Sequence, residues 1–384
     1  MEPTMNTIMR KSLLALAIGA GMTSLSAQAE ITIGLAGPVT GPVAQYGDMQ
    51  FIGAEMAIER INAQGGVNGE MLKGVKYDDA CEPKQAVAVA NQIVNDGVQF
   101  VVGHLCSSAT QPASDIYAEE GILMITPAST SPTITEAGYE TVFRTIGRDD
   151  AQGPVAGRFI AEHIKPENMA IIHDKQQYGE GVATAVRDTV EEAGIDVAVF
   201  EGITAGQQNY SSLVSKLKRE NVDFVYYGGY HPELGLILRQ AKELGFDAQF
   251  MGPEGVGNPD ISKIAGEASE GLLVTLPQAF ETDPKNADLV AAFEAKNQDP
   301  SGPFVMPAYT AVYLMAEGMK ATESTDPFEV AEYLHQNTSD TPIGEVKYDE
   351  SGDLEEFNFV VYNWHADGTK TKAETGEAQS DTAQ

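Results

Sequence analysis

The sequence predicts an α/β fold of two domains, each built on a parallel β-sheet with helices on both faces. The chain has 384 residues, a length that suits two domains better than one. Short apolar or β-branched runs alternate with segments of helical periodicity, which is typical of parallel sheets. Glycines such as Gly97 and Gly194 follow the helical segments, where a helix commonly ends in a left-handed residue.

The alternation predicts the elements in order along the chain. Strands are predicted at residues 31–36, 98–102, 169–173, 197–200, 223–227 and 271–275. Helices are predicted at residues 51–62, 85–95, 153–164, 181–193, 210–219 and 234–244. Because ligands bind at the carboxyl ends of the strands in such sheets, two sheets of this kind can enclose one ligand between them.

The first residues predict export. Arg10 and Lys11 precede an apolar stretch, and Ser26-Ala27-Gln28-Ala29 has the small-residue pattern of a cleavage site. We therefore expect a signal peptide over residues 1–29, cleaved after Ala29. No later segment has the length of a membrane span, so no direct membrane insertion is expected.

The composition excludes some partners. The formal net charge is −32 at pH 7, with a pI of about 4.4. Nucleic acid and anionic lipid surfaces are therefore not expected as partners, because both bind clustered Lys and Arg. Such acidity fits a saline habitat, where salt screens the self-repulsion. The polar residues 370–384 are expected to form a disordered tail.

No metal or cofactor is expected either. The histidines show no metal-ligand spacing and lie at His104, His163, His173, His231, His335 and His365. No Walker or G-x-G-x-x-G sequence follows a strand, so energy coupling would reside in another polypeptide. The acid pairs Asp78-Asp79 and Asp149-Asp150 are interpreted as solvated loop residues.

The only two cysteines are Cys81 and Cys106. In an oxidising compartment such a pair most simply forms a disulfide, which we expect here. The alternative is a catalytic thiol at Cys106. That thiol would need a histidine partner, and the nearby His104 would point to the opposite face if this run is a strand.

The run from His104 to Pro112 predicts an anion site. A strand-like stretch gives way there to small hydroxylated residues that open a helix. A helix N-terminus presents unpaired N–H groups and a positive dipole end; the serines would cap it, and Pro112 would lie in its first turn. The same run also fits a capped helix with no ligand.

Long collinear motifs resemble the periplasmic branched-chain amino-acid binding proteins of ABC importers, the Leu/Ile/Val type. They read GPVAQYGDMQFIGAEMAIERINAQGGVNG, YDDACEPKQAVAVANQIVNDG, VVGHLCSSATQPASDIYAEEGILMITPAST, HDKQQYGEG, DFVYYGGYHPE and FMGPEGVGN. The resemblance implies two doubly wound parallel-sheet lobes joined by three crossovers. Lobe 1 would comprise residues 30–148 and 278–357, and lobe 2 residues 149–277 and 358–369.

The resemblance also implies a binding site for an amino acid. Ser107 and Thr130 would hold its carboxylate, and Ala128, Thr130 and Glu254 its ammonium. The side-chain pocket would consist of Tyr46, Leu105, Cys106, Tyr178, Tyr230 and Phe304. An uncharged aromatic pocket suits an aliphatic side chain, because a charged one would find no partner there. Pro307, shortly after Phe304, departs from the family pattern.

The expected function is capture of L-leucine, L-isoleucine and L-valine in the periplasm by a monomer whose cleft closes on the ligand, for delivery to an inner-membrane ABC permease. No catalytic residue is expected. One alternative is an amidohydrolase that uses Cys106 or Ser107, although the sequence offers no histidine base for it. Another is the same fold as a sensor or carrier for a short amide or another amino acid. Glu254 argues against an amide, because its charge would neutralise an ammonium.

Overall fold

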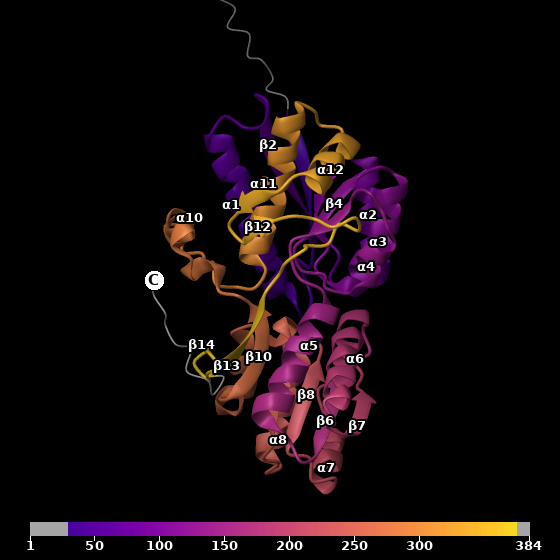
Figure 1. Cartoon of the computed structure of the whole chain (residues 1–384), viewed down its shortest axis with the longest axis vertical. Coiled ribbons are helices and arrows are strands. Elements are labelled where there is room, and N and C mark those ends of the chain that lie inside the picture. The colour runs from indigo at the N-terminus through magenta and orange to yellow at the C-terminus, as the bar shows by residue number, and fades with distance from the viewer. Residues whose placement is uncertain (1–29, 375–384) are drawn as a thin grey trace, which may run out of the picture.

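A computed structural model describes residues 30–374, which form two lobes stacked along the long axis of the molecule (Figure 1). The predicted signal peptide and residues 375–384 of the predicted tail lie outside the described residues. The expected α/β fold of two parallel-sheet lobes is confirmed.

The first lobe contains a fully parallel sheet of order β2-β1-β3-β4-β5. Its strands are β1 (Glu30–Gly37), β2 (Met71–Asp78), β3 (Phe100–Val102), β4 (Leu123–Thr126) and β5 (Val142–Arg144). The helices between them are α1 (Ala44–Ala63), α2 (Pro83–Asn95), α3 (Ser107–Glu119) and α4 (Thr133–Glu136). On β1, Ile33 and Leu35 pack toward α1, whereas Ala36 packs toward α2 and α3. Helices therefore cover both faces, as the apolar strands require.

The second lobe has a sheet of order β14-β13-β10-β9-β8-β6-β7. Its strands are β6 (Met169–His173), β7 (Val197–Gly202), β8 (Phe224–Gly228), β9 (Gln249–Gly252), β10 (Leu272–Pro277), β13 (Phe359–Trp364) and β14 (Lys370–Lys372). Its helices are α5 (Asp149–Phe159), which continues as η1 (Ile160–Ile164), α6 (Gln177–Glu192), α7 (Ser211–Arg219), α8 (His231–Glu243), η2 (Glu254–Val256), α9 (Asp260–Ala265) and η3 (Gly266–Ser269). Strands β13 and β14 pair antiparallel at one edge. The expectation of a disordered tail from residue 370 is therefore wrong for Lys370–Lys372, which pair with β13.

The chain passes between the sheets three times: after β5, after β10 and before β13. The part between the second and third passages contains η4 (Phe280–Thr282), η5 (Pro284–Asn286), α10 (Ala287–Glu294), α11 (Val305–Thr322), α12 (Pro327–Gln336), β11 (Ser339–Thr341) and β12 (Gly344–Val346). Helix α11 packs on α1, so this part covers one face of the first sheet (Figure 1). Pro307 lies in the first turn of α11, where its missing N–H costs no helical hydrogen bond.

Each predicted strand overlaps an observed one, and each predicted helix lies within or overlaps a helical segment. Most helices begin earlier than predicted, because apolar periodicity starts only after the first polar turn. Gly97 and Gly194, after α2 and α6, have φ of +70° and +86°, as the predicted helix ends require.

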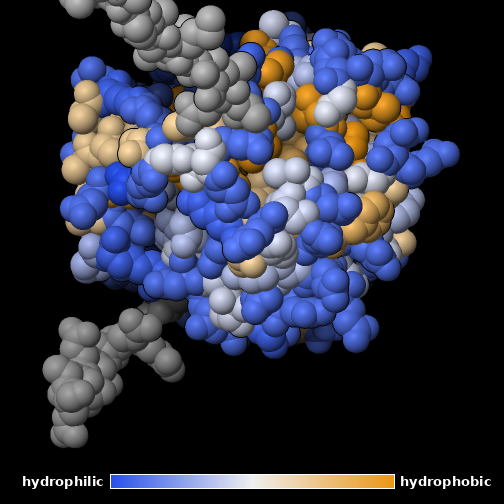
Figure 2. All heavy atoms as spheres, turned by 90° about the horizontal axis from the view of Figure 1, so that it is seen from above, coloured by the Kyte–Doolittle hydropathy of each residue, from blue (hydrophilic) through white to orange (hydrophobic). Residues whose placement is uncertain are grey.

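Hydrophilic side chains cover most of the face seen from the first lobe (Figure 2), as the high net charge predicts. Within residues 30–374, no helix is long and apolar enough to cross a membrane.

Candidate functional site

The ten candidate contact residues lie where the two sheets face each other. They follow the carboxyl ends of strands or begin helices: Leu105, Cys106 and Ser107 after β3, Ala128 and Thr130 after β4, Tyr230 after β8, Glu254 after β9, Tyr46 in α1, Tyr178 in α6, and Phe304 before α11. All ten are buried, with no more than 6% of the surface of any residue exposed. The structure therefore brings together the entire predicted set in a closed cleft.

The predicted anion site lies at the start of α3. Helix α3 begins at Ser107, but no serine side chain caps it, and the predicted cap is wrong. The Ser107 hydroxyl instead accepts the Ser131 N–H at 3.3 Å, which joins the loops after β3 and β4. Pro112 lies inside α3 rather than in its first turn, so that prediction is also wrong. The positive end of the helix dipole still faces the cleft beside Ser107.

Buried hydroxyl groups connect the loops after β3 and β4. Ser129 Oγ lies 2.5 Å from Thr110 Oγ1 and donates to the Leu105 carbonyl oxygen at 2.9 Å. Thr126 Oγ1 donates to the His104 carbonyl oxygen at 2.7 Å. The hydroxyl of Thr130, by contrast, is buried with no hydrogen-bond partner of ordinary geometry among the described residues, although it lies near enough to the Asp149 carboxyl group to offset part of the rise in that group's pKa. A buried hydroxyl of this kind marks a place for a polar ligand.

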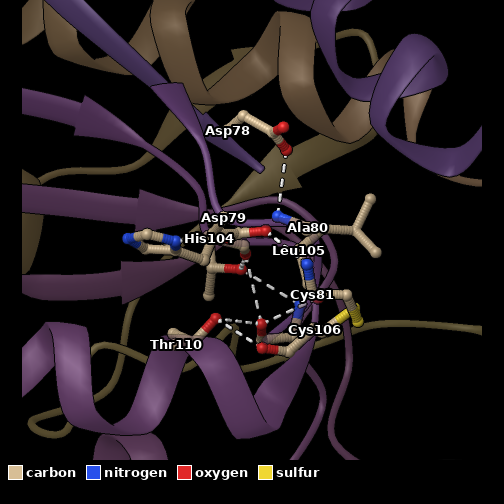
Figure 3. The surroundings of a disulfide bond; sticks show 10 residues. Asp78, Asp79, Ala80, Cys81, His104, Leu105, Cys106 and Thr110 are labelled. Carbon is tan, nitrogen blue, oxygen red and sulfur yellow. Dashed lines mark hydrogen bonds and ion pairs between the residues drawn. A yellow bond between two sulfur atoms is a disulfide. The ribbon is translucent and has the colours of Figure 1, made fainter. Parts of the chain in front are cut away.

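The predicted disulfide between Cys81 and Cys106 is present, with a Cα–Cα distance of 5.5 Å (Figure 3). The His104 ring is fully buried and lies 2.5 Å from Asp79 Oδ2 and 2.9 Å from the Tyr117 hydroxyl. Asp79 also accepts the Cys81 N–H at 2.7 Å, which fixes the loop that carries this cysteine. With its sulfur in a disulfide, Cys106 cannot act as a thiol nucleophile. His104 is already bonded on both ring nitrogens.

Thiol labelling of the denatured, unreduced protein should find no free thiol. Replacing both cysteines by serine should lower the free energy of unfolding by about 3 kcal/mol, because the bond closes a loop in the unfolded chain. Urea unfolding of this variant and of the wild type, with and without reductant, measures the loss. Reduced wild type should match the variant; two labelled thiols per chain would contradict the assignment.

The six predicted pocket residues share one hydrophobic cluster that joins the lobes, together with Val43, Ile146, Val182 and Phe359 among others. The Tyr46 ring meets Phe304 edge-on at a centroid distance of 5.3 Å. On the opposite lobe, the ring centroids of Tyr178 and Tyr230 lie 5.2 Å apart. The side chains of this cluster are aliphatic, aromatic or sulfur-containing, so it can bury an aliphatic group.

Glu254 begins η2 and is 1% exposed. Its Oε2 has no hydrogen-bond partner in the part of the chain that the structure describes. The next residue, Gly255, donates its N–H to the Tyr178 hydroxyl at 2.9 Å. A Cβ atom at this position would lie 2.7 Å from the same oxygen, so the close approach requires glycine. Burial raises the pKa of Glu254 to about 7. A buried carboxyl group with one oxygen left without a partner suits a cationic ligand group.

Direct contacts between lobes keep the cleft closed. The Gln177 amide of α6 lies within 3.1 Å of Gln111, Ser131 and Thr133, all in the first lobe. Beside them a cavity of about 470 Å³ is lined by both lobes, with Ser108 and Tyr230 in its wall. The Tyr46 hydroxyl donates to the Glu254 carbonyl oxygen at 3.4 Å across the same gap.

The sequence reasoning missed several buried polar groups. Asp149, interpreted as solvated, is 2% exposed, and Asp79 is fully buried. Arg144 is also fully buried and pairs with Asp353 at 2.5 Å. Neither the periodicity nor the spacing of these residues signals their burial. Among the described residues, no group of three or more His, Cys, Asp or Glu is arranged to hold a metal ion.

Residues 30–369 match the periplasmic binding protein family. A leucine-, isoleucine-, valine-, threonine- and alanine-binding protein of Pseudomonas aeruginosa is 64% identical over 354 residues, 92% of this chain and 95% of that protein. The Leu/Ile/Val-binding protein of Escherichia coli K12 is 54% identical over 363 residues, 94% of this chain and 98% of the relative. A leucine binding protein from Thermotoga maritima is structurally similar, with a TM-score of 0.83 and 26% identity, covering 90% of this chain and 98% of that chain.

Proposed function

The chain belongs to the periplasmic binding protein family, and on that premise we propose that it captures L-leucine, L-isoleucine and L-valine and delivers them to an ABC importer. One observation carries this proposal: an uncharged aromatic cluster lies between a helix N-terminus and a buried carboxyl group without a full set of partners. An α-amino acid with an aliphatic side chain has the three complementary groups.

In this proposal each part of the ligand has its own partners. The Ser107 and Thr130 hydroxyls, with the start of α3, hold the carboxylate. The Ala128 carbonyl oxygen, the Thr130 hydroxyl and the Glu254 carboxylate hold the ammonium. Tyr46, Leu105, Cys106, Tyr178, Tyr230 and Phe304 enclose the side chain. The names of the Pseudomonas aeruginosa and Escherichia coli relatives support the ligand class.

The biological setting follows from the same premise. The protein acts as a monomer in the periplasm, after cleavage of the signal peptide at Ala29, and docks on an inner-membrane ABC permease. It performs no catalysis, and Cys106, whose sulfur is in a disulfide, offers no thiol nucleophile. A buried carboxyl group at Glu254 disfavours a neutral amide as ligand, because the amide would leave that group without a cation.

Ligand-free protein, prepared by unfolding and refolding, should melt at a higher temperature with L-leucine, L-isoleucine and L-valine. A ligand at a hundredfold excess over Kd stabilises the folded state by about 2.7 kcal/mol. L-threonine and L-alanine belong in the same series, because the relative in Pseudomonas aeruginosa is named for them as well.

Three analogues serve as controls. D-leucine should fail, because the inverted α-carbon cannot keep both charged contacts and also point its side chain at Tyr46. Isovalerate lacks the ammonium and isoamylamine lacks the carboxylate, so each should lose several kcal/mol, on the order of the cost of an unpaired buried group. A larger shift with acetamide, urea or an acidic amino acid than with L-leucine would refute the branched-chain assignment. Steady ammonia release would show an enzyme instead.

A further inference from the structure

The proposed ligand site is closed to solvent in this arrangement of the lobes. Its ten contact residues come from both lobes, and none is more than 6% exposed. A ligand can therefore enter or leave only when the lobes separate, and every hydrogen bond that crosses between them must break for release. A side chain that makes such bonds controls how long the ligand stays, even where it does not touch the ligand.

Gln177, the first residue of α6 in the second lobe, makes such cross-lobe bonds with its side-chain amide. The amide nitrogen lies 3.1 Å from Gln111 Oε1, 3.0 Å from Ser131 Oγ and 2.9 Å from Thr133 Oγ1. Gln111 belongs to α3, whereas the other two residues lie after β4 and at the start of α4. One amide therefore ties the second lobe to two separate segments of the first.

The three acceptors are already held together within the first lobe. Thr133 Oγ1 donates to Gln111 Oε1 at 2.7 Å, and Ser131 Oγ lies 3.2 Å from Thr133 Oγ1. These contacts do not involve the second lobe, so separation of the lobes leaves them intact. Closure then has few further side chains to order on this side, and a preorganised acceptor makes a cross-lobe hydrogen bond more favourable.

The second lobe fixes the position of the donor. The buried Asp174 accepts the Gln176 N–H at 2.9 Å and so shapes the turn from which α6 begins. The residue after Gln177 is Tyr178, which is buried in the proposed side-chain pocket. Gln177 itself is half-buried, so its amide lies at the rim of the cleft, directly beside the pocket.

The loop that carries Ser131 also reaches the proposed carboxylate site. The Ser131 N–H donates to the Ser107 hydroxyl at 3.3 Å, while the Ser131 hydroxyl accepts from Gln177. A ligand carboxylate at Ser107 and the Gln177 amide therefore act on the same loop. Gln177 is not one of the proposed ligand contacts, so its effect on the ligand passes through this loop and through the closure of the lobes.

We propose that Gln177 is a positioning residue that holds the cleft closed around its ligand, and that its cross-lobe hydrogen bonds set the rate of ligand release. The proposal rests on the proposed function, because these bonds affect release only if a ligand is captured between the lobes. Thr133 is exposed and Gln177 half-buried, so water competes for the bonds and their contribution is moderate. Their loss should speed release about tenfold and leave association nearly unchanged, because the lobes are apart when the ligand arrives.

Stopped-flow mixing with L-leucine, followed by intrinsic protein fluorescence, measures both rates in the wild type and in Gln177→Met. This substitution keeps the length of the side chain and removes its amide. Release should be about tenfold faster, with association within about twofold of the wild-type rate. Unchanged release, or a loss that lies mainly in association, would overturn the proposal while leaving the proposed function intact. Failure of the wild type to bind L-leucine would overturn both.

A variant of the first lobe tests whether the two lobes act through the same bonds. Gln111→Met removes one acceptor and should speed release by itself, which tests the proposal even where Gln177→Met does not fold. The double variant should release L-leucine no faster than Gln177→Met alone, because both changes remove the same contact. Effects that multiply would show that the two side chains act independently and would overturn the proposal.

Gln176→Met is the matched control, because Gln176 is the preceding residue, has the same side chain and is also half-buried. Its side chain makes no hydrogen bond to the first lobe within residues 30–374, and its backbone N–H bonds to Asp174 in its own lobe. This variant should release L-leucine at the wild-type rate. Release as fast as that of Gln177→Met would assign the effect to the start of α6 as a whole, and the proposal would be rejected.

Discussion

Replacing Glu254 by Gln should weaken L-leucine binding by two to three orders of magnitude at pH 7.5, a loss of about 3–4 kcal/mol. The ammonium would keep the Ala128 carbonyl oxygen and the Thr130 hydroxyl but would lose its only carboxylate in a site that excludes water. Tyr230→Phe removes a neutral hydroxyl from the same cleft and should cost about 1 kcal/mol, roughly fivefold in Kd. Titration calorimetry of both variants gives the comparison. Equal losses would show that the Glu254 carboxylate does not meet the ammonium.

The same residue should shape the pH dependence of stability in the closed form. The pKa of Glu254 is raised from 4.5 to about 7 by burial, so the folded state binds the proton more tightly than the unfolded chain. The contribution of Glu254 to stability is therefore fully present below pH 4.5 and is lost as the pH rises through 7. Glu254→Gln should remove this part of the pH-dependent decline in the free energy of unfolding. Urea unfolding from pH 5 to 8 measures it, and an unchanged decline in the variant would assign it to other acids.

Replacing Arg144 by Met should lower the free energy of unfolding by about 4 kcal/mol, because it breaks a buried ion pair and its hydrogen bonds. The guanidinium is fully buried and lies 2.5 Å from Asp353. It donates to the Ser129 and Ser131 carbonyl oxygens at 2.8 and 3.1 Å. These bonds hold the loop that carries Thr130, so L-leucine affinity should fall together with stability.

Arg187→Met is the matched control, because the Arg187 side chain is 32% exposed and pairs with Asp188 at 2.7 Å. This surface pair should contribute about 1 kcal/mol or less. Urea unfolding of both ligand-free variants gives the two losses. A loss in Arg144→Met no larger than that in Arg187→Met would mean that Arg148, 2.8 Å from Asp353, already satisfies this acid.

Local sequence signals were sufficient for much of this molecule. The alternation of apolar runs and helical periods predicted the α/β class, because side-chain burial in strands and helices follows periods that are readable within ten residues. The disulfide was also predictable, since the chain offers only two cysteines. The pocket residues were named from motif resemblance, and the structure gathers them in one cluster. Short strands such as β5 and β14 escaped prediction, because three residues do not show a period, and the longer strands β2 and β13 were missed as well.

Only the tertiary structure decided which polar residues are buried. Asp149 and Asp150 are neighbours of the same chemical type, yet one is buried and the other reaches solvent. Arg144 and Asp353 are 209 positions apart in the sequence, and they pair because the chain returns to the first lobe before it crosses to β13. Desolvation depends on every atom packed around a group, and most of those atoms come from distant segments. The charge states in the cleft therefore depend on the folded arrangement of the two lobes.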